Sequence, residues 1–207
     1  MPALKIVHFS DVLCVWAYVG QVSVFPDTDA KINKAWQDRG GFSGYANHVK
    51  MIAKGFDGAI IHDDVWSRVR PKSSASPHLF IKAIELLEHE TTGGTFFSRT
   101  SIRAARELRT AFFAEGQDIS DWMVQRAIGK KIGVDFEEVL KKIETGEAIA
   151  KLASDYELGQ SLRVQGSPTY ILNEGRQILY GNISYSILDA NISELLAENG
   201  HEIGSNC

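Results

Sequence analysis

Cys14 is the residue of this chain whose type and position best suit covalent chemistry. It lies in the stretch FSDVLCVWAYVG, just after an apolar run at residues 4–9 that is typical of a short buried strand. The residues after Cys14 are predicted to begin a helix, whose free N–H groups and dipole stabilise an anion. We therefore expect the pKa of the Cys14 thiol to lie below the value of about 8.5 for a free thiol, which raises the fraction of the nucleophilic thiolate.

The local sequence also fits a second interpretation, in which Cys14 only fills space. Its neighbours Leu13, Val15 and Trp16 are apolar, and free cysteine is among the residue types most often buried. The residues around Cys14 leave both interpretations open.

A second stretch, VQGSPTYILN at residues 164–173, places a proline directly before a β-prone run. Proline cannot donate to a sheet ladder, so Pro168 must lie at the first residue of the strand. The Ser167–Pro168 bond is either cis, as about 5–6% of such bonds are in folded proteins, or part of an ordinary turn.

The remaining pattern predicts one domain with a helical insert. Residues 169–173 and 176–180 are β-prone runs separated by Glu174-Gly175, which indicates a hairpin, and an amphipathic helix follows at residues 184–200. An isolated hairpin is marginal in water, so we expect it to share a sheet with residues 4–9. The expected core is residues 1–27 and 162–207, with a helical insertion at residues 28–161.

This order of elements, with the two quoted stretches, resembles the DsbA-like branch of the thioredoxin superfamily. The segment AFFAEGQDISD at residues 111–121 is also similar to a part of that family's insertion. The resemblance implies an α/β, thioredoxin-like fold with a large all-helical insertion. It also implies a catalytic thiol at Cys14 that faces a cis-proline loop. Substrate-binding roles fall on Trp16, Ser167, Pro168 and Thr169.

Two departures from the family pattern change what is expected. Ala17 stands where dithiol members have a second cysteine, so Cys14 is expected to work as a single thiol whose mixed disulfide an outside thiol resolves. Only seven residues separate Cys14 from the run at residues 22–25, whereas a parallel crossover takes a dozen or more. Either one edge strand is absent or the natural protein is longer than this sequence.

The leading function is a DsbA-like thiol–disulfide oxidoreductase that acts on a small thiol or disulfide, or on a protein disulfide. No bound cofactor is expected, and glutathione is a candidate co-substrate. One alternative is a glutathione-dependent isomerase or kappa-class-like transferase, although those relatives use serine at the position of Cys14. They also carry an Asp–Arg pair that LYGNISY (179–185) lacks. Another alternative is a binding protein without enzymatic activity.

Composition excludes several other classes. A formal net charge of −4 gives no electrostatic basis for binding nucleic acid or an anionic membrane. The N-terminus lacks a signal-peptide pattern, so a cytoplasmic location is expected. Two cysteines make no disulfide framework, and the six histidines lack zinc-site spacing, so no metal is expected. The sequence does not indicate an oligomeric state.

The insertion is expected to be helical from about residue 30 to residue 161 and to form a lid beside Cys14. Two apolar segments, residues 78–80 and residues 112–113, are predicted to line that lid. The alternative is that their aromatic side chains fill the core of the insertion itself.

Overall fold

The fold of the chain is given by a computed structural model that describes residues 5–14, 28–89 and 98–198. Within these residues, three short antiparallel strands form one sheet in the order β1-β2-β3: β1 (Ile6–Phe9), β2 (Thr169–Leu172) and β3 (Gln177–Tyr180). Val7 lies opposite Ile171, so residues 164 positions apart in the sequence (171 − 7) are neighbours in the sheet. The predicted sheet, which joins the N-terminal strand to the C-terminal hairpin, is confirmed.

The hairpin connection is longer than the two residues predicted. A single 3₁₀ turn, η4 (Asn173–Gly175), joins β2 to β3, and Asn173 and Glu174 both have positive φ angles of 50° and 61°. Asparagine tolerates this left-handed conformation better than most residues. The turn therefore starts one residue earlier than the Glu174-Gly175 pattern indicates.

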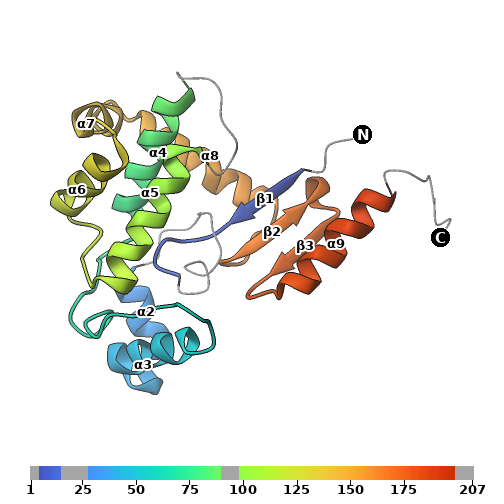
Figure 1. Cartoon of the computed structure of the whole chain (residues 1–207), viewed down its shortest axis with the longest axis horizontal. Helices are drawn as coiled ribbons and strands as arrows, with labels where there is room; N and C mark the ends of the chain where they lie inside the picture. Colours follow the sequence, from blue (N-terminus) through green and yellow to red (C-terminus); the bar gives the residue numbers. More distant parts are fainter. Residues whose placement is uncertain (1–4, 15–27, 90–97, 199–207) are drawn as a thin grey trace.

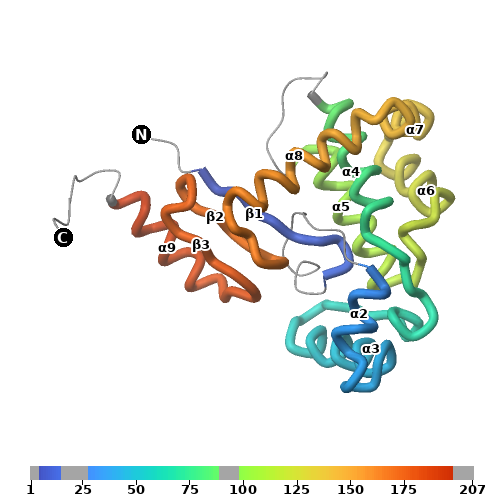
Figure 2. The backbone as a smooth tube through the Cα atoms, turned by 180° about the vertical axis from the view of Figure 1, so that it is seen from behind, coloured from blue at the N-terminus to red at the C-terminus, as the bar shows by residue number. Residues whose placement is uncertain are grey.

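Most of the chain between β1 and β2 is helical, and one further helix follows β3 (Figure 1). The helices are α2 (Asp29–Trp36), η1 (Gln37–Arg39), α3 (Gly41–Ala53), α4 (Ala75–His89), α5 (Thr100–Arg109), the π-helical turn η3 (Thr110–Ala114), α6 (Trp122–Ile132), α7 (Phe136–Glu144), α8 (Glu147–Ser161) and α9 (Tyr185–Glu198). The helices α2 to α8 lie together on one side, and the sheet with α9 lies on the other (Figures 1 and 2).

The expectation that residues 30–161 are helical throughout is wrong for residues 54–74. This described segment contains turns and two isolated bridges, Thr28 to Ser73 and Val65 to Val69, and neither bridge extends into a strand. Its glycines and Pro71 disfavour helix. The backbone carbonyl of Asp64 also accepts three hydrogen bonds from residues 67–69, which closes a compact loop instead.

The helical side has a large hydrophobic core of its own, and the predicted lid residues belong to it. Phe80, Phe112 and Phe113 are fully buried in this core. The Phe112 ring meets Trp66 edge-on, with ring centroids 5.4 Å apart. The expectation that these aromatics line a lid is therefore wrong, because they fill the core of the insertion. Val12 and Leu13, which lie just after β1, pack into the same core.

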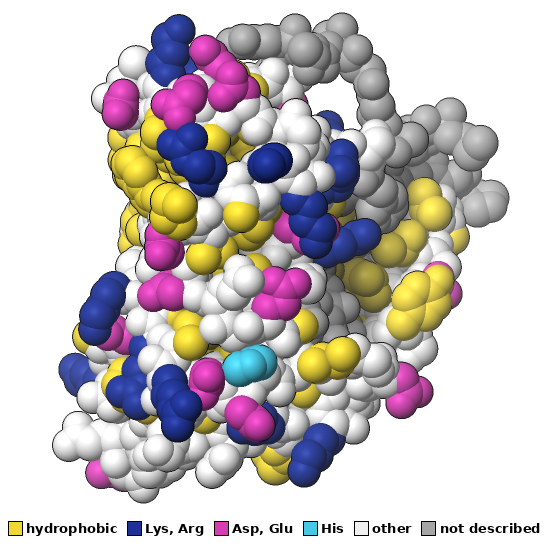
Figure 3. Space-filling model, turned by 60° about the vertical axis from the view of Figure 1, so that its left-hand side comes forward, with side chains coloured by type: hydrophobic (Ala, Val, Ile, Leu, Met, Phe, Trp, Pro, Cys, Tyr) yellow, Lys and Arg dark blue, Asp and Glu magenta, His cyan; other side chains and the backbone are white. Residues whose placement is uncertain are grey.

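The stretch in which an edge strand parallel to β1 would fall, residues 15–27, lies outside the described residues, so the expected absence of that strand stays a prediction. Among the described strands, β1 pairs with β2 alone. No helix in the described part of the chain is long and apolar enough to cross a membrane. On the face shown in Figure 3, lysine and arginine side chains are interspersed with aspartate and glutamate.

Candidate active site around Cys14

The described chain from β1 ends at Cys14, immediately after a tight turn. The Cys14 backbone N–H donates to the carbonyl of Asp11 at 3.2 Å, and the side chain is half-buried and outside any disulfide. The predicted helix after Cys14, with Trp16 and Ala17, lies outside the described residues. The roles predicted for Trp16 and for that helix therefore stay predictions.

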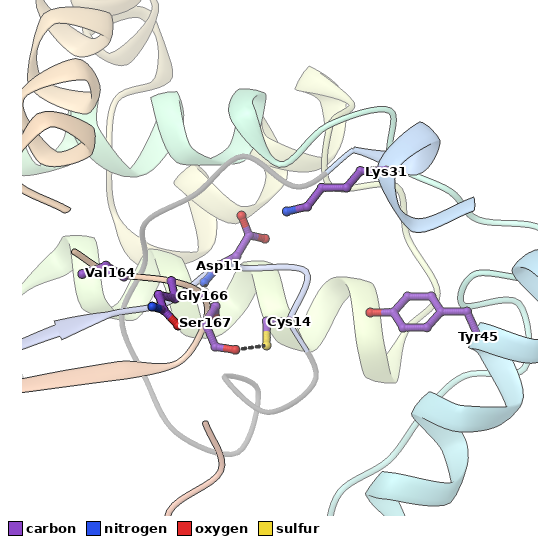
Figure 4. Close-up of a pocket in the computed structure, with 8 residues that line it drawn as sticks. Asp11, Cys14, Lys31, Tyr45, Val164, Gly166 and Ser167 are labelled. Atoms are coloured by element: carbon purple, nitrogen blue, oxygen red, sulfur yellow. Dashed lines mark hydrogen bonds between the residues drawn. The ribbon is translucent and has the colours of Figure 1, made fainter. Parts of the chain in front are cut away.

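The loop before β2 meets the segment after β1 at two points, Cys14 and Asp11, both shown in Figure 4. The Cys14 thiol donates to the Ser167 carbonyl, with sulfur and oxygen 3.5 Å apart. The Asp11 backbone N–H donates to Ser167 Oγ at 2.8 Å. The Ser167–Pro168 bond is cis, the isomer that the family resemblance implied. Cys14 and Ser167, although distant in sequence, thus lie in direct contact.

Thr169 is buried at the start of β2, where it supports the loop. Its hydroxyl donates to the Gly166 carbonyl at 2.7 Å, and only 1% of the residue is exposed. The Pro168 carbonyl accepts from the Gly181 N–H at 2.9 Å. Thr169 therefore fixes the loop from within rather than offering a surface to a substrate.

A cavity of about 320 Å³ opens beside the thiol. Its lining comes from three parts of the chain: Asp11, Cys14, Lys31, Tyr45, Val164, Gln165, Gly166 and Ser167. The amino group of Lys31 and the hydroxyl of Tyr45 point inward from α2 and α3 of the insertion (Figure 4). This volume is typical of a small-molecule site.

Asp11 is a buried carboxylate at the bottom of this site. It accepts from the Leu13 N–H at 2.8 Å, from Ser74 Oγ at 2.5 Å and from His78 Nε2 at 3.1 Å. Burial raises the pKa of Asp11, but the hydrogen bond and charge of His78, with the bonds from Ser74 and Leu13, hold it below its ordinary value of 3.8. Asp11 is therefore ionised, and His78 must carry its proton on Nε2.

Arg109 supplies the positive charge that matches Asp11. It is the last residue of α5, it is fully buried, and its Nη2 donates to Ser10 Oγ at 3.1 Å. Burial lowers the pKa of Arg109 to about 10, and the negative charges of Asp11 and Cys14 oppose that shift. Arg109 therefore stays charged at neutral pH beside the loop that carries the thiol.

The sequence analysis did not predict most of the buried polar residues that surround the loop of Cys14. It did not single out Asp11, Ser74 or Arg109, and it placed His78 on a lid surface instead of on Asp11. One signal was available: Arg109 lies on a helix face with Ile102 and Ala105, both buried, and a lone charge on an apolar face requires a buried partner. Among the described residues, no group of three histidine, cysteine or acidic side chains could hold a metal ion.

Comparison with known proteins agrees with this fold. Residues 96–193 match the model of the DSBA-like thioredoxin domain. The fold is the DsbA-like thioredoxin fold, with a helical insertion and a reduced sheet. The resemblance to the DsbA-like branch of the thioredoxin superfamily is thereby confirmed.

Three solved structures share the fold at low sequence identity. A protein disulfide isomerase candidate from Nitrosomonas europaea has a TM-score of 0.70 and 10% identity, over 95% of this chain and 99% of that one. The cytosolic disulfide reductase DsbM from Pseudomonas aeruginosa, solved with GSH, has a TM-score of 0.62 and 19% identity, over 93% and 98% of the two chains. A 2-hydroxychromene-2-carboxylate isomerase has a TM-score of 0.63 and 14% identity, over 94% and 97%.

One curated relative matches by sequence. The ClpXP adapter protein SpxH of Bacillus licheniformis is 24% identical over 147 residues, which are 69% of this chain and 44% of that protein. The match thus spans less than half the length of this relative.

Proposed function

We propose that the chain is a thiol-dependent oxidoreductase of the DsbA-like type, in which Cys14 reacts as a single thiol with a small disulfide or a thiol conjugate. One observation supports this most strongly. Cys14 contacts the carbonyl of Ser167, the residue before the cis bond, and both residues line a cavity large enough for a small molecule.

The chemistry follows from a single thiolate. The Cys14 sulfur attacks one sulfur of the substrate disulfide, a mixed disulfide forms, and the other substrate sulfur leaves as a thiolate that takes up a proton. Because Ala17 offers no second thiol, an outside thiol then attacks the mixed disulfide and releases Cys14. One such cycle frees one half of the substrate as a thiol and leaves the outside thiol in a disulfide with the other half. A second outside thiol that attacks this new disulfide frees the other half, so complete reduction of one disulfide consumes two outside thiols, which end as a disulfide with each other.

Glutathione is the co-substrate that we propose. Its disulfide carries several carboxylates, and Lys31 brings a positive charge to the cavity wall. A fold relative, DsbM, was solved with GSH. A cytoplasmic location accords with this proposal, because glutathione keeps thiols reduced in that compartment.

Treatment with oxidised glutathione tests the proposal. In a Cys207→Ser variant, mass spectrometry is expected to show one glutathione adduct at Cys14 that dithiothreitol removes, because Ala17 cannot resolve it. The matched control, with both cysteines replaced by serine, is expected to show none. An unmodified Cys14 after prolonged treatment would contradict the proposal.

Two other functions each have one observation in their favour. The fold similarity to 2-hydroxychromene-2-carboxylate isomerase favours a glutathione-dependent isomerase or transferase, and turnover that survives Cys14→Ser would support it. The sequence match to an adapter protein favours a binding role without catalysis, and a Cys14 that is inert toward disulfides would support that one.

A further inference from the structure

Arg109 is a buried cation that packing alone does not explain. The residue is 1% exposed, and its guanidinium donates to the Ala105 carbonyl at 3.4 Å and to Ser10 Oγ at 3.1 Å. Its Nε–H has no hydrogen-bond partner among the described residues. Burying a charge is costly unless opposite charge compensates it. The negative groups near Arg109 therefore offset part of the cost of burying its charge.

Those negative groups belong to the loop of the candidate site. Asp11 and the thiolate form of Cys14 are the two groups whose charges stabilise protonated Arg109. Ser10, which Arg109 contacts directly, precedes Asp11 in the same loop. Asp11 already accepts three hydrogen bonds from other groups, so its charge is spread over several donors. Arg109 thus lies at the inner side of the loop, where its positive charge attracts both anions.

We propose that Arg109 is a positioning residue for Cys14: it holds the loop through Ser10 and supplies the buried positive charge that favours the Cys14 thiolate over the thiol. The inference rests on the proposed function, since it concerns the same sulfur. It assigns to the helical insertion a direct part in activating the thiol, from a residue of α5 that is 95 positions beyond Cys14 in the sequence.

Other charged and titratable groups face the same sulfur or its neighbours. Asp11 opposes the thiolate from the same loop, and His78 of α4 bonds to Asp11. Burial, then the charge of Arg109, lowers the pKa of His8 on β1 to about 3, so this side chain adds no charge at neutral pH. Lys31 and Tyr45 line the cavity from α2 and α3.

Of the two cations near Cys14, Arg109 has the larger effect on the thiolate. Lys31 is exposed, so water and salt screen its charge. The Ser167 carbonyl accepts a hydrogen bond from the thiol and favours the neutral form. Without Arg109, the charge of Asp11 and this carbonyl would both act against the thiolate with no buried counter-charge.

The test is the pH dependence of Cys14 alkylation by iodoacetamide, a neutral reagent, in the Cys207→Ser chain. Arg109→Met removes the charge and is expected to move the midpoint up by about one pH unit or more. Arg109→Lys keeps the charge and is expected to stay close to the parent. Asp11→Asn removes the opposing charge and is expected to move the midpoint down.

Further controls separate charge from structure. Arg109→Gln keeps a donor for Ser10 without the charge, so it should shift the midpoint as Arg109→Met does. If neither variant folds, Ser10→Ala decides instead: it removes the hydroxyl through which Arg109 holds the loop, so the midpoint is expected to rise. Unchanged midpoints in the uncharged Arg109 variants, or in Ser10→Ala where those variants do not fold, overturn the inference while the proposed function stands. A parent Cys14 that is inert at every pH overturns both.

Discussion

Replacing Cys14 with alanine is expected to lower the rate of glutathione-dependent disulfide reduction at least about a thousandfold, to the rate of uncatalysed exchange. The nucleophile is the group on which every later step depends, so its loss removes the covalent pathway entirely. The measurement is turnover of a small disulfide in the presence of glutathione, coupled to the oxidation of a reduced nicotinamide by glutathione reductase.

Two variants make this result specific. Cys207→Ser, at the other cysteine, is expected to keep the parent rate. Cys14→Ser is expected to be as inactive as Cys14→Ala, because a hydroxyl cannot form the mixed disulfide. A Cys14→Ala protein that retains more than about a tenth of the parent rate would place the chemistry on another residue, since loss of an essential nucleophile costs far more than tenfold.

Replacing Asp11 with alanine is expected to lower the free energy of unfolding by about 3–5 kcal/mol, the usual cost of removing one partner of a buried charged pair. The change breaks the buried contact of Asp11 with His78, removes the acceptor of Ser74, and takes away one of the two negative charges that offset buried Arg109. Urea unfolding followed by circular dichroism measures the loss. Asp189→Ala on the exposed surface of α9 is the matched control, expected to change stability by less than about 0.5 kcal/mol.

The Asp11 effect should also depend on pH in one direction. The folded protein holds the pKa of Asp11 below 3.8, so its stabilising contacts are present above that value and are lost as the pH falls through the lower folded value. The difference in stability between the parent and Asp11→Ala should therefore shrink below about pH 4. One unsatisfied buried polar group alone costs about 1 kcal/mol or more. If Asp11→Ala lowers the free energy of unfolding by less than about 1 kcal/mol at neutral pH, the result would contradict the buried network.

The sheet could be predicted because its evidence is local. The sequence shows an apolar run at residues 4–9 and two β-prone runs around a turn. Because a hairpin needs a partner to be stable in water, these segments are expected to join in one sheet. The contact between Cys14 and the loop at Ser167 was predicted from the family resemblance. The hydrophobic pattern of the sequence does not say which distant segments meet. The insertion was recognised as helical for the same local reasons, apart from residues 54–74.

The layer behind the thiol could not be predicted in the same way, because it depends on how helices pack. His78 bonds to Asp11 across 67 residues, and Arg109 contacts Ser10 across 99. Which face of α4 or α5 turns toward the loop is set by the core of the insertion. In α5, Arg106 and Arg109 look equivalent in the sequence, yet Arg106 is exposed and Arg109 is buried.

The rate of Cys14 alkylation against pH, in the Cys207→Ser chain, tests most directly whether this protein acts through a reactive thiol. We predict that the rate rises with a midpoint below the free-thiol value of about 8.5, and that unfolding in urea returns the midpoint to that value. Slow alkylation at every pH up to about 9, with fast alkylation only after unfolding, would contradict the prediction and make Cys14 a packing residue.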